Sequence, residues 1–439
     1  MKSARSIFLI GSFSLLCPFA FSATPASSPL LQEDSQGQAN IRQELISIRA
    51  EDGRGSYGIL LTPTDKTPST AILNMHPRGD GRGYFNTPLA KAGFAVFGHA
   101  NRHVLNDRDG IHEEMLLDIA AGMRFLKGRG FQKIVILGMS GGGPLMVYYQ
   151  AQASTPPPGR VSTPAGDPPN LNEFDLPPAD GLLLVIPLVG QGNILQARID
   201  PSVINEGDPL SIDPSLDMYN PANGFRMPPQ VTTYSQEFID RYREGQRKRI
   251  ERLDRWARDL IAEQNHYKSL MEQPDFKDLP FEQQQWIERN AATERMMTIY
   301  RTWADLRYMD LKIDPSDRIV GTNSGTTPWI DNFASRPTPD FMKPRAFLSS
   351  RSAISSHAAT LKNIPKVKVP TIIIQGTAHR ALYPSDTESI FEVVGAEDKK
   401  LVWIVGGDVS MNPSGPKAGK GDQRQQAIDA AVSWMLERF

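Results

Sequence analysis

The segment that decides the fold of this chain is Gly138-Met139-Ser140-Gly141-Gly142-Gly143. It follows an apolar, β-branched run over residues 134–137 and precedes a helix-compatible run over residues 144–153. A serine flanked by glycines at a strand-to-helix junction has the G-x-S-x-G pattern of a nucleophile elbow. The turn is so tight that only residues with little or no side chain fit beside the serine. We therefore expect Ser140 to present a nucleophilic hydroxyl and the N–H of Gly141 to face an oxyanion.

The first 22 residues have the composition of a secretory signal. Two basic residues come first, an apolar run follows over residues 7–16, and Ala20-Phe21-Ser22 supplies a small-x-small cleavage site. Residues 23–40 are rich in Ser, Pro and Gln and are expected to form a flexible leader. The single cysteine, Cys17, lies inside the signal, so the mature chain should carry no disulfide. These features predict a periplasmic or secreted protein.

The charge and the motifs of the chain argue against nucleic acid, a metal ion or a membrane span as its partner. Removing the two basic residues of the signal leaves 46 Lys and Arg against 49 Asp and Glu, a formal net charge of −3. A protein that binds nucleic acid usually carries an excess of basic residues, and this chain has none. No H-E-x-x-H or Cys/His cluster occurs, and no segment after the signal approaches the ~20 apolar residues of a membrane span. We expect a small-molecule substrate, no cofactor or metal and no stable membrane insertion, and make no prediction of oligomeric state.

Apolar runs alternate with helical patterns along most of the chain. Such alternation predicts an α/β fold with a mostly parallel, twisted sheet of about eight strands. Continuously apolar runs are typical of strands that are covered on both faces. The expected strands are residues 41–49, 57–62, 71–75, 92–98, 134–137, 181–189, 371–375 and 401–405, and the expected helices are residues 111–127, 144–153, 385–394 and 423–439.

The pattern changes between Val189 and Pro370, where a large helical insertion is expected. Residues 201–229 are rich in Pro, Asp and Asn and predict a loop. Residues 234–271 and 281–309 carry apolar residues at helical spacing, which predicts a two-helix hairpin. We interpret residues 190–365 as a cap over the sheet edge that carries Ser140. Its Met, Trp and Tyr residues suit a partly apolar acyl or aromatic substrate, or the core of the hairpin itself.

Elbow, strand ladder and insertion together resemble the α/β-hydrolase family. The resemblance covers residues 41–439, with the core in 41–189 and 366–439, and residues 369–378 resemble the penultimate core strand of the family. It implies a serine hydrolase that acts on a carboxylic ester or related acyl compound through an acyl-enzyme on Ser140, and the N-terminal signal predicts that this hydrolase is exported. The family acid is expected directly after Gly376-Thr377-Ala378, where His379 stands instead. The family histidine is expected in the 406–409 turn, where Val409 follows Asp408.

Three interpretations of these departures remain open. In the first, the pair is exchanged, so that His379 is the general base and Asp408 orients its imidazole. In the second, the base is another histidine, either His76 after the 71–75 strand or His357 at the end of the cap. In the third, the triad is lost and the scaffold binds a ligand without turning it over. A non-hydrolytic lyase or acyltransferase on the same fold is a further alternative.

The second oxyanion donor is expected from the turn after Met75. Pro77 has no N–H, so Arg78 or Gly79 must supply the donor, and His76 is expected to line the same turn. The guanidinium of Arg78 is also suited to a substrate carboxylate, unless it pairs with Asp80 or solvent. His99 and His103 lie four residues apart in a loop, which is a spacing too weak to predict a metal site.

Overall fold

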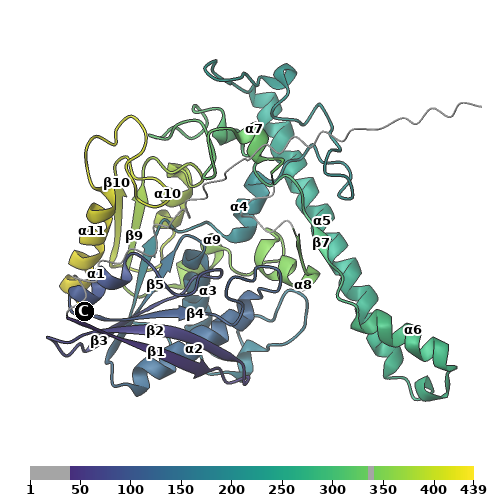
Figure 1. Ribbon diagram of the computed structural model, residues 1–439, viewed down its shortest axis with the longest axis horizontal. Coiled ribbons are helices and arrows are strands. Elements are labelled where there is room, and N and C mark those ends of the chain that lie inside the picture. Colours follow the sequence, from purple (N-terminus) through teal and green to yellow (C-terminus); the bar gives the residue numbers. More distant parts are fainter. Residues whose placement is uncertain (1–39, 335–340) are drawn as a thin grey trace, which may run out of the picture. The chain divides into compact units, whose positions relative to one another are not determined.

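The structure is a computed structural model that describes residues 40–334 and 341–439. The predicted signal and most of the predicted flexible leader lie outside the described residues. The core begins with strands and helices in alternation, in the order β1 (Ile41–Arg49), β2 (Gly55–Pro63), β3 (Thr70–Asn74), α1 (Asn86–Lys91), β4 (Ala95–Ala100), α2 (His112–Gly128), β5 (Lys133–Met139), α3 (Gly142–Ala153) and β6 (Gly181–Val185). It closes with β9 (Thr371–Gly376), α10 (Pro384–Glu392), β10 (Lys399–Ile404) and α11 (Gln423–Arg438) (Figure 1).

Eight strands form one sheet in the order β1-β2-β4-β3-β5-β6-β9-β10. β2 pairs antiparallel with both β1 and β4, and the pairs from β4 to β10 are parallel. The predicted mostly parallel sheet of about eight strands is confirmed. Its order and the elbow after β5 are those of the α/β-hydrolase fold that the sequence resembles.

The sheet is buried on both faces because its strands are apolar at successive positions. Along β5, Ile134 and Ile136 pack on one side with α2 and α3, whereas Val135 and Leu137 pack on the other side with α1 and α11. The same alternation occurs in β3, β6 and β9. Such strands have no polar face, which explains why the continuous apolar runs were recognisable as core strands.

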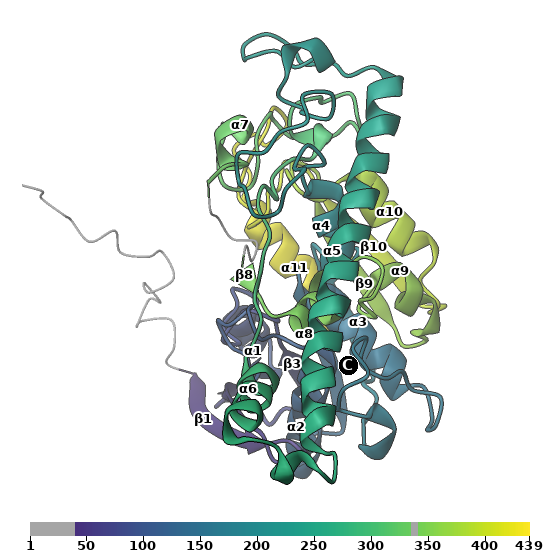
Figure 2. The ribbon, with the colours of Figure 1, turned by 90° about the vertical axis from the view of Figure 1, so that its right-hand side faces the viewer.

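The insertion contains α4 (Gln191–Arg198), α5 (Gln236–Met271), α6 (Phe281–Ala292), β7 (Met297–Thr298), the 3-10 helix η4 (Leu306–Tyr308), α7 (Pro328–Asp331), β8 (Phe341–Met342), α8 (Pro344–Ala346), the π-helical turn η5 (Phe347–Arg351) and α9 (Thr360–Asn363). Ser235 caps α5 by accepting the N–H of Phe238 at 3.2 Å. α5 and α6 pack against each other, and α4 and α8 also contact α5 (Figure 2). The domain division at residues 190 and 366 stays a prediction.

Two predicted elements are too long. The helix predicted over 281–309 ends at Ala292, because the following backbone groups bond to other elements: the carbonyl of Arg301 accepts from Asp200 N at 2.9 Å and Ala304 N donates to Arg198 O at 2.7 Å. The strand predicted over 181–189 ends at Val185, where Ile186 has φ 46° and the chain turns toward the elbow. After Ala292, hydrogen bonds to other segments replace those of the predicted helix, whereas the strand ends because the backbone turns at Ile186.

Candidate active site

Ser140 occupies the turn between β5 and α3. Its φ is +51°, a left-handed conformation that is unfavourable for a residue with a Cβ. Gly138, two residues before Ser140, has no room for a side chain, because a Cβ there would lie 2.6 Å from the carbonyl oxygen of Gly142. A Cβ on Gly143 would lie 2.7 Å from Cβ of Pro187. The structure therefore has the strand–turn–helix conformation predicted for this motif, whereas the catalytic role of Ser140 stays a prediction.

Two side-chain nitrogens converge beside Gly141. A Cβ built on this glycine would lie 3.1 Å from His76 Nε2 and 3.1 Å from Gln191 Nε2. His76 follows β3, which pairs with β5, and Gln191 begins α4 after β6, the other neighbour of β5. Within residues 40–334 and 341–439, neither nitrogen nor the N–H of Gly141 has a hydrogen-bond partner. Three groups that can donate thus surround the space in front of the elbow.

The hydrogen bonds of His76 fix its tautomer. The N–H of Arg78 donates to Nδ1 of His76 at 3.1 Å, so in the neutral ring the proton is on Nε2. Burial lowers the pKa of His76 to about 4, and the charges of Arg78 and Arg351 act in the same direction. At neutral pH Nε2 is therefore a donor. A general base toward Ser140 needs the opposite tautomer, with an unprotonated Nε2.

The backbone N–H groups of Arg78 and Gly79, which the sequence analysis expected to donate to an oxyanion, have other partners in this structure. The N–H of Arg78 is engaged by His76 Nδ1, and the N–H of Gly79 donates to the carbonyl of His76 at 3.3 Å. The turn folds back on His76, and the donor it directs to the elbow is the ring Nε2. The side chain of Arg78 pairs with Asp107, whereas Asp80 pairs with Arg82.

A buried chain of polar groups orients Gln191. Arg351 Nη1 donates to Gln191 Oε1, which leaves the amide nitrogen directed to the elbow, and Arg351 Nη2 lies 3.7 Å from Asp107 Oδ2. Arg351 is 7% exposed, and its Nε has no partner in the described part of the chain. Burial lowers the pKa of Arg351 to about 10, opposed by Asp107, so the guanidinium stays charged at neutral pH.

His379 and Asp408 do not form the exchanged pair. Nδ1 of His379 accepts the N–H groups of Ala381 and Leu382, each at 3.0 Å, which again places the neutral proton on Nε2. Burial lowers the pKa of this ring to about 3. Oδ1 of Asp408 accepts two backbone N–H groups of its own turn, at 2.8 Å each. Among the residues that the structure describes, no hydrogen bond joins His379 to Asp408 or to Ser140.

The other histidines named in the sequence analysis contact other groups. The ring of His357 packs 6.5 Å from that of Tyr148, and burial lowers its pKa. His99 Nε2 lies 2.9 Å from Ser56 Oγ, and His103 pairs with Glu114. His112 was not named there; it is buried, and neither of its ring nitrogens has a hydrogen-bond partner among the described residues. No group of three or more His, Cys, Asp or Glu residues in 40–334 and 341–439 is arranged to hold a metal ion.

Sequence reasoning missed a buried carboxyl group behind the elbow helix. Glu113, in the first turn of α2, is fully buried and accepts Ser349 Oγ at 2.6 Å and the hydroxyl of Tyr148 at 3.1 Å. Burial raises its pKa to about 7, and the hydrogen bonds oppose this rise. No local signal marks Glu113, because acidic residues in a first helical turn are usually solvated. Gln191 had a usable signal: it is a polar residue just beyond the carboxyl end of a core strand.

No family model and no curated protein matches the chain. Solved structures of similar architecture include the α/β hydrolase GrgF from a Penicillium species, at 10% identity and TM-score 0.48 over 90% of this chain and 99% of that one. Another is carboxyl esterase 2 of Tuber melanosporum, at 12% identity and TM-score 0.43 over 93% and 90% of the two chains. Similarity at this level of identity concerns the fold alone, so the chemistry of the site rests on its own residues. None of the helices in the described ranges has the length and apolar character needed to cross a membrane.

Proposed function

We propose that this chain, which has the α/β-hydrolase fold, binds a small carboxylic acid or ester at the Ser140 turn and does not hydrolyse it efficiently. The observation that carries this proposal is the tautomer of the two imidazoles at the sheet edge. Both His76 and His379 have Nδ1 occupied by backbone N–H groups, so each presents a donor rather than a base. A serine hydroxyl is a weak nucleophile without a base within hydrogen-bond reach.

The donors suit a ligand oxygen. An oxygen in front of Gly141 can accept from its N–H, from His76 Nε2 and from Gln191 Nε2, the arrangement that stabilises an oxyanion or a carboxylate. His76 retains its donor form at physiological pH because its pKa is about 4. Recognition therefore needs no proton transfer.

Gly141→Ala tests the binding site. The new methyl group would occupy the space 3.1 Å from both side-chain donors, so binding of butyrate by the full-length mature protein should be lost in calorimetric titration. Ser140→Ala is the matched variant, since it removes a hydroxyl and leaves all three donors, and it should bind butyrate within about threefold of the wild type. Equal butyrate binding by wild type and Gly141→Ala would contradict the proposal.

Hydrolysis through an acyl-enzyme on Ser140 is the second candidate. The conformation of Ser140, with φ +51°, favours it because strain of this kind clusters at functional sites. A fluorophosphonate probe and 4-nitrophenyl butyrate separate the two functions. Stoichiometric labelling together with turnover, both lost in Ser140→Ala, would establish the hydrolase and remove the binding-only proposal. A folded, butyrate-binding protein that is not labelled would exclude the hydrolase.

Export belongs to the same proposal. The basic, apolar and small-residue order of residues 1–22 supports it. Fractionation of the cells that make the protein, with N-terminal sequencing of the recovered chain, should yield a periplasmic or secreted product that begins after Ser22. A full-length chain retained in the cytoplasm would contradict export.

A further inference from the structure

We propose that Arg351 makes the Ser140 elbow selective for a carboxylate over an uncharged carbonyl compound. This inference rests on the function proposed above and names the class of ligand. Arg351 lies in the π-helical turn η5, and its Nη1 donates to Oε1 of Gln191, whose amide nitrogen faces Gly141. Single π-helical turns are frequent at functional sites. Arg351 thus acts on the ligand through Gln191 and through its own charge, as a positioning residue.

The hydrogen bond from Arg351 decides which end of the Gln191 amide faces the elbow. A guanidinium has donors only, so it holds Oε1 and leaves Nε2 directed at the ligand. A Cβ built on Gly141 would lie 3.1 Å from this nitrogen and 3.1 Å from Nε2 of His76. Both nitrogens donate, and a carboxylate, which only accepts, can satisfy both. The amino group of an uncharged amide would instead face a donor.

The positive charge of Arg351 is only partly balanced by the residues around it. Its Nη2 lies 3.7 Å from Oδ2 of Asp107, and the same oxygen lies closer to Nε of Arg78. Burial lowers the pKa of Arg351 to about 10 against the charge of Asp107, and the positive charges of Arg78 and Arg198 act in the same direction as burial. Arg198 is buried, donates to the carbonyl of Ala381 at 3.1 Å and makes no ion pair within residues 40–334 and 341–439. An anion beside Gln191 therefore supplies a charge that Arg351 and Arg198 lack.

The other carboxylates of the neighbouring segments have partners of their own. The pairs are Asp80–Arg82, Asp109–Lys343, Glu114–His103, Asp118–Arg102, Asp200–Arg301 and Asp254–Arg258. Glu113 accepts from two hydroxyl groups, and burial raises its pKa to about 7, so it is mostly protonated at pH 6. Among the described residues, this leaves Asp107 as the carboxylate that pairs with Arg351.

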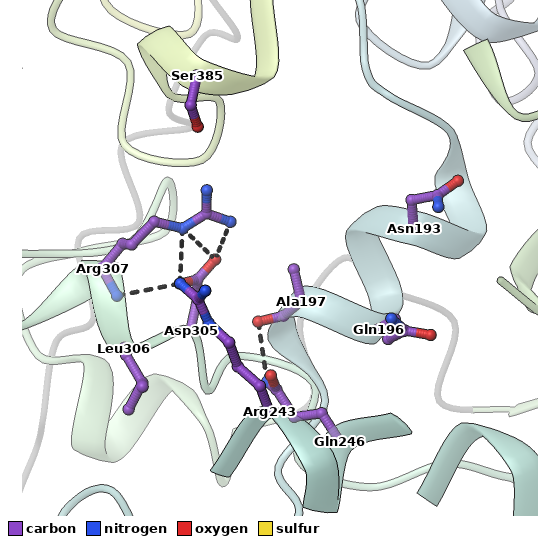
Figure 3. Close-up of a pocket in the computed structure, with 9 residues that line it drawn as sticks. All are labelled: Asn193, Gln196, Ala197, Arg243, Gln246, Asp305, Leu306, Arg307 and Ser385. Atoms are coloured by element: carbon purple, nitrogen blue, oxygen red, sulfur yellow. Dashed lines mark hydrogen bonds and ion pairs between the residues drawn. The ribbon is translucent and has the colours of Figure 1, made fainter. Parts of the chain in front are cut away.

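Arg307 shows what a balanced guanidinium looks like in the same chain. It lines a cavity of about 310 Å³ beside α4 and is held by Asp305 at 2.8 Å (Figure 3). Asp386 and Asp314 lie 3.5 and 3.6 Å from its Nη1. The charge of Arg307 is therefore neutralised within the chain, whereas Arg351 shares a single carboxylate with Arg78.

Calorimetric titration of the full-length mature protein at pH 6 tests the selectivity. The ligands are butyrate, butyramide and 2-pentanone, in which a methyl group replaces one carboxylate oxygen of butyrate. We expect the wild type to bind butyrate at least about tenfold more tightly than either uncharged ligand. Arg351→Gln removes the charge and should lower this preference about tenfold, whereas Arg351→Lys keeps the charge and should preserve the preference within about threefold.

The preference is a ratio of two affinities, so a general loss of structure that weakens both ligands leaves it unchanged. Arg345→Gln is the matched control, because Arg345 lies in the adjoining helix α8 and pairs with Asp167. This variant should keep the preference of the wild type.

Asp107→Asn changes the charge in the opposite direction. It removes the negative charge that opposes an anionic ligand, so butyrate should bind about threefold more tightly or better, and 2-pentanone should bind as it does to the wild type. Asp109→Asn, in the same loop, is the control: Asp109 pairs with Lys343 at 3.0 Å, and both affinities should stay at their wild-type values.

Each contrary result has a distinct meaning. Equal preference in wild type and Arg351→Gln, or butyrate binding by Asp107→Asn that is unchanged or weaker, would overturn the inference. If Gly141→Ala still loses butyrate binding in that case, the elbow site stands and only the role of Arg351 falls. A wild type that binds no butyrate at about 10 mM would overturn this inference together with the proposed function. If Arg351→Gln does not fold, Asp107→Asn and the preference of the wild type decide.

Discussion

Glu113→Gln should remove the pH dependence that this buried carboxyl group imposes on the free energy of unfolding. In the folded chain Glu113 is fully buried, and burial raises its pKa from 4.5 to about 7. Between these two values the unfolded chain ionises at this position while the folded chain stays protonated. The contribution of Glu113 to the free energy of unfolding is therefore greatest below pH 4.5 and declines as the pH rises to about 7.

The size of the effect follows from the two pKa values. At about 1.4 kcal/mol per pH unit, the rise from 4.5 to about 7 makes the wild type about 3 kcal/mol less stable at pH 8 than at pH 4.5 through this group alone. Glutamine has no such titration. Ser349 Oγ and the Tyr148 hydroxyl can rotate to serve an amide, because a hydroxyl both donates and accepts.

Urea unfolding of wild type and variant at a series of pH values measures the difference. The free energy of unfolding of Glu113→Gln minus that of wild type should rise by about 3 kcal/mol between pH 4.5 and pH 8. The other titrating groups are the same in both proteins, so their contributions cancel in the difference between the two free energies of unfolding. Glu114→Gln, the next residue, whose carboxylate is partly exposed and pairs with His103, is the control and should show no rise of this size. A difference that stays flat with pH would refute the reasoning.

Three further substitutions test the elbow and the buried histidines. Gly138→Ala should lower the free energy of unfolding by about 2 kcal/mol or more, because the new Cβ would lie 2.6 Å from a backbone oxygen. Gly128→Ala is the control and should be neutral or slightly stabilising, because nothing lies within 4 Å of its Cβ position. Equal effects of the two substitutions in denaturant titrations would contradict the geometry. Ser140→Gly should raise the free energy of unfolding by about 0.5–1 kcal/mol by relieving a φ of +51°, and Ser140→Ala, which keeps a Cβ, should not. Burial lowers the pKa of His112 to about 3, so its contribution to the free energy of unfolding is complete above pH 6.5 and is lost as the pH falls toward 3. His112→Phe should therefore become more stable relative to wild type as the pH falls from 6.5 to 4. A difference in the free energy of unfolding that stays constant over this range would exclude the titration.

The sequence by itself determined the fold and the position of the elbow. Continuous apolar runs such as residues 134–137 are typical of strands that are covered on both faces, as these residues are in the structure. The glycines around Ser140 permit a turn that a residue with a Cβ would block. His76 and His379 were also placed correctly after their strands, on either side of the strand of Ser140 and its neighbour β6. These conclusions depend on patterns among neighbouring residues, and such patterns can be recognised in the sequence alone.

Only the tertiary structure decided what those histidines can do. Their tautomers depend on backbone N–H groups that fold back onto Nδ1, and no residue type signals this conformation. The orientation of Gln191 depends on Arg351, 160 residues away in the chain, and the protonation of Glu113 depends on burial that its helix position does not reveal. Hydrogen-bond direction and desolvation arise from contacts between distant segments, so they are absent from any local pattern in the sequence.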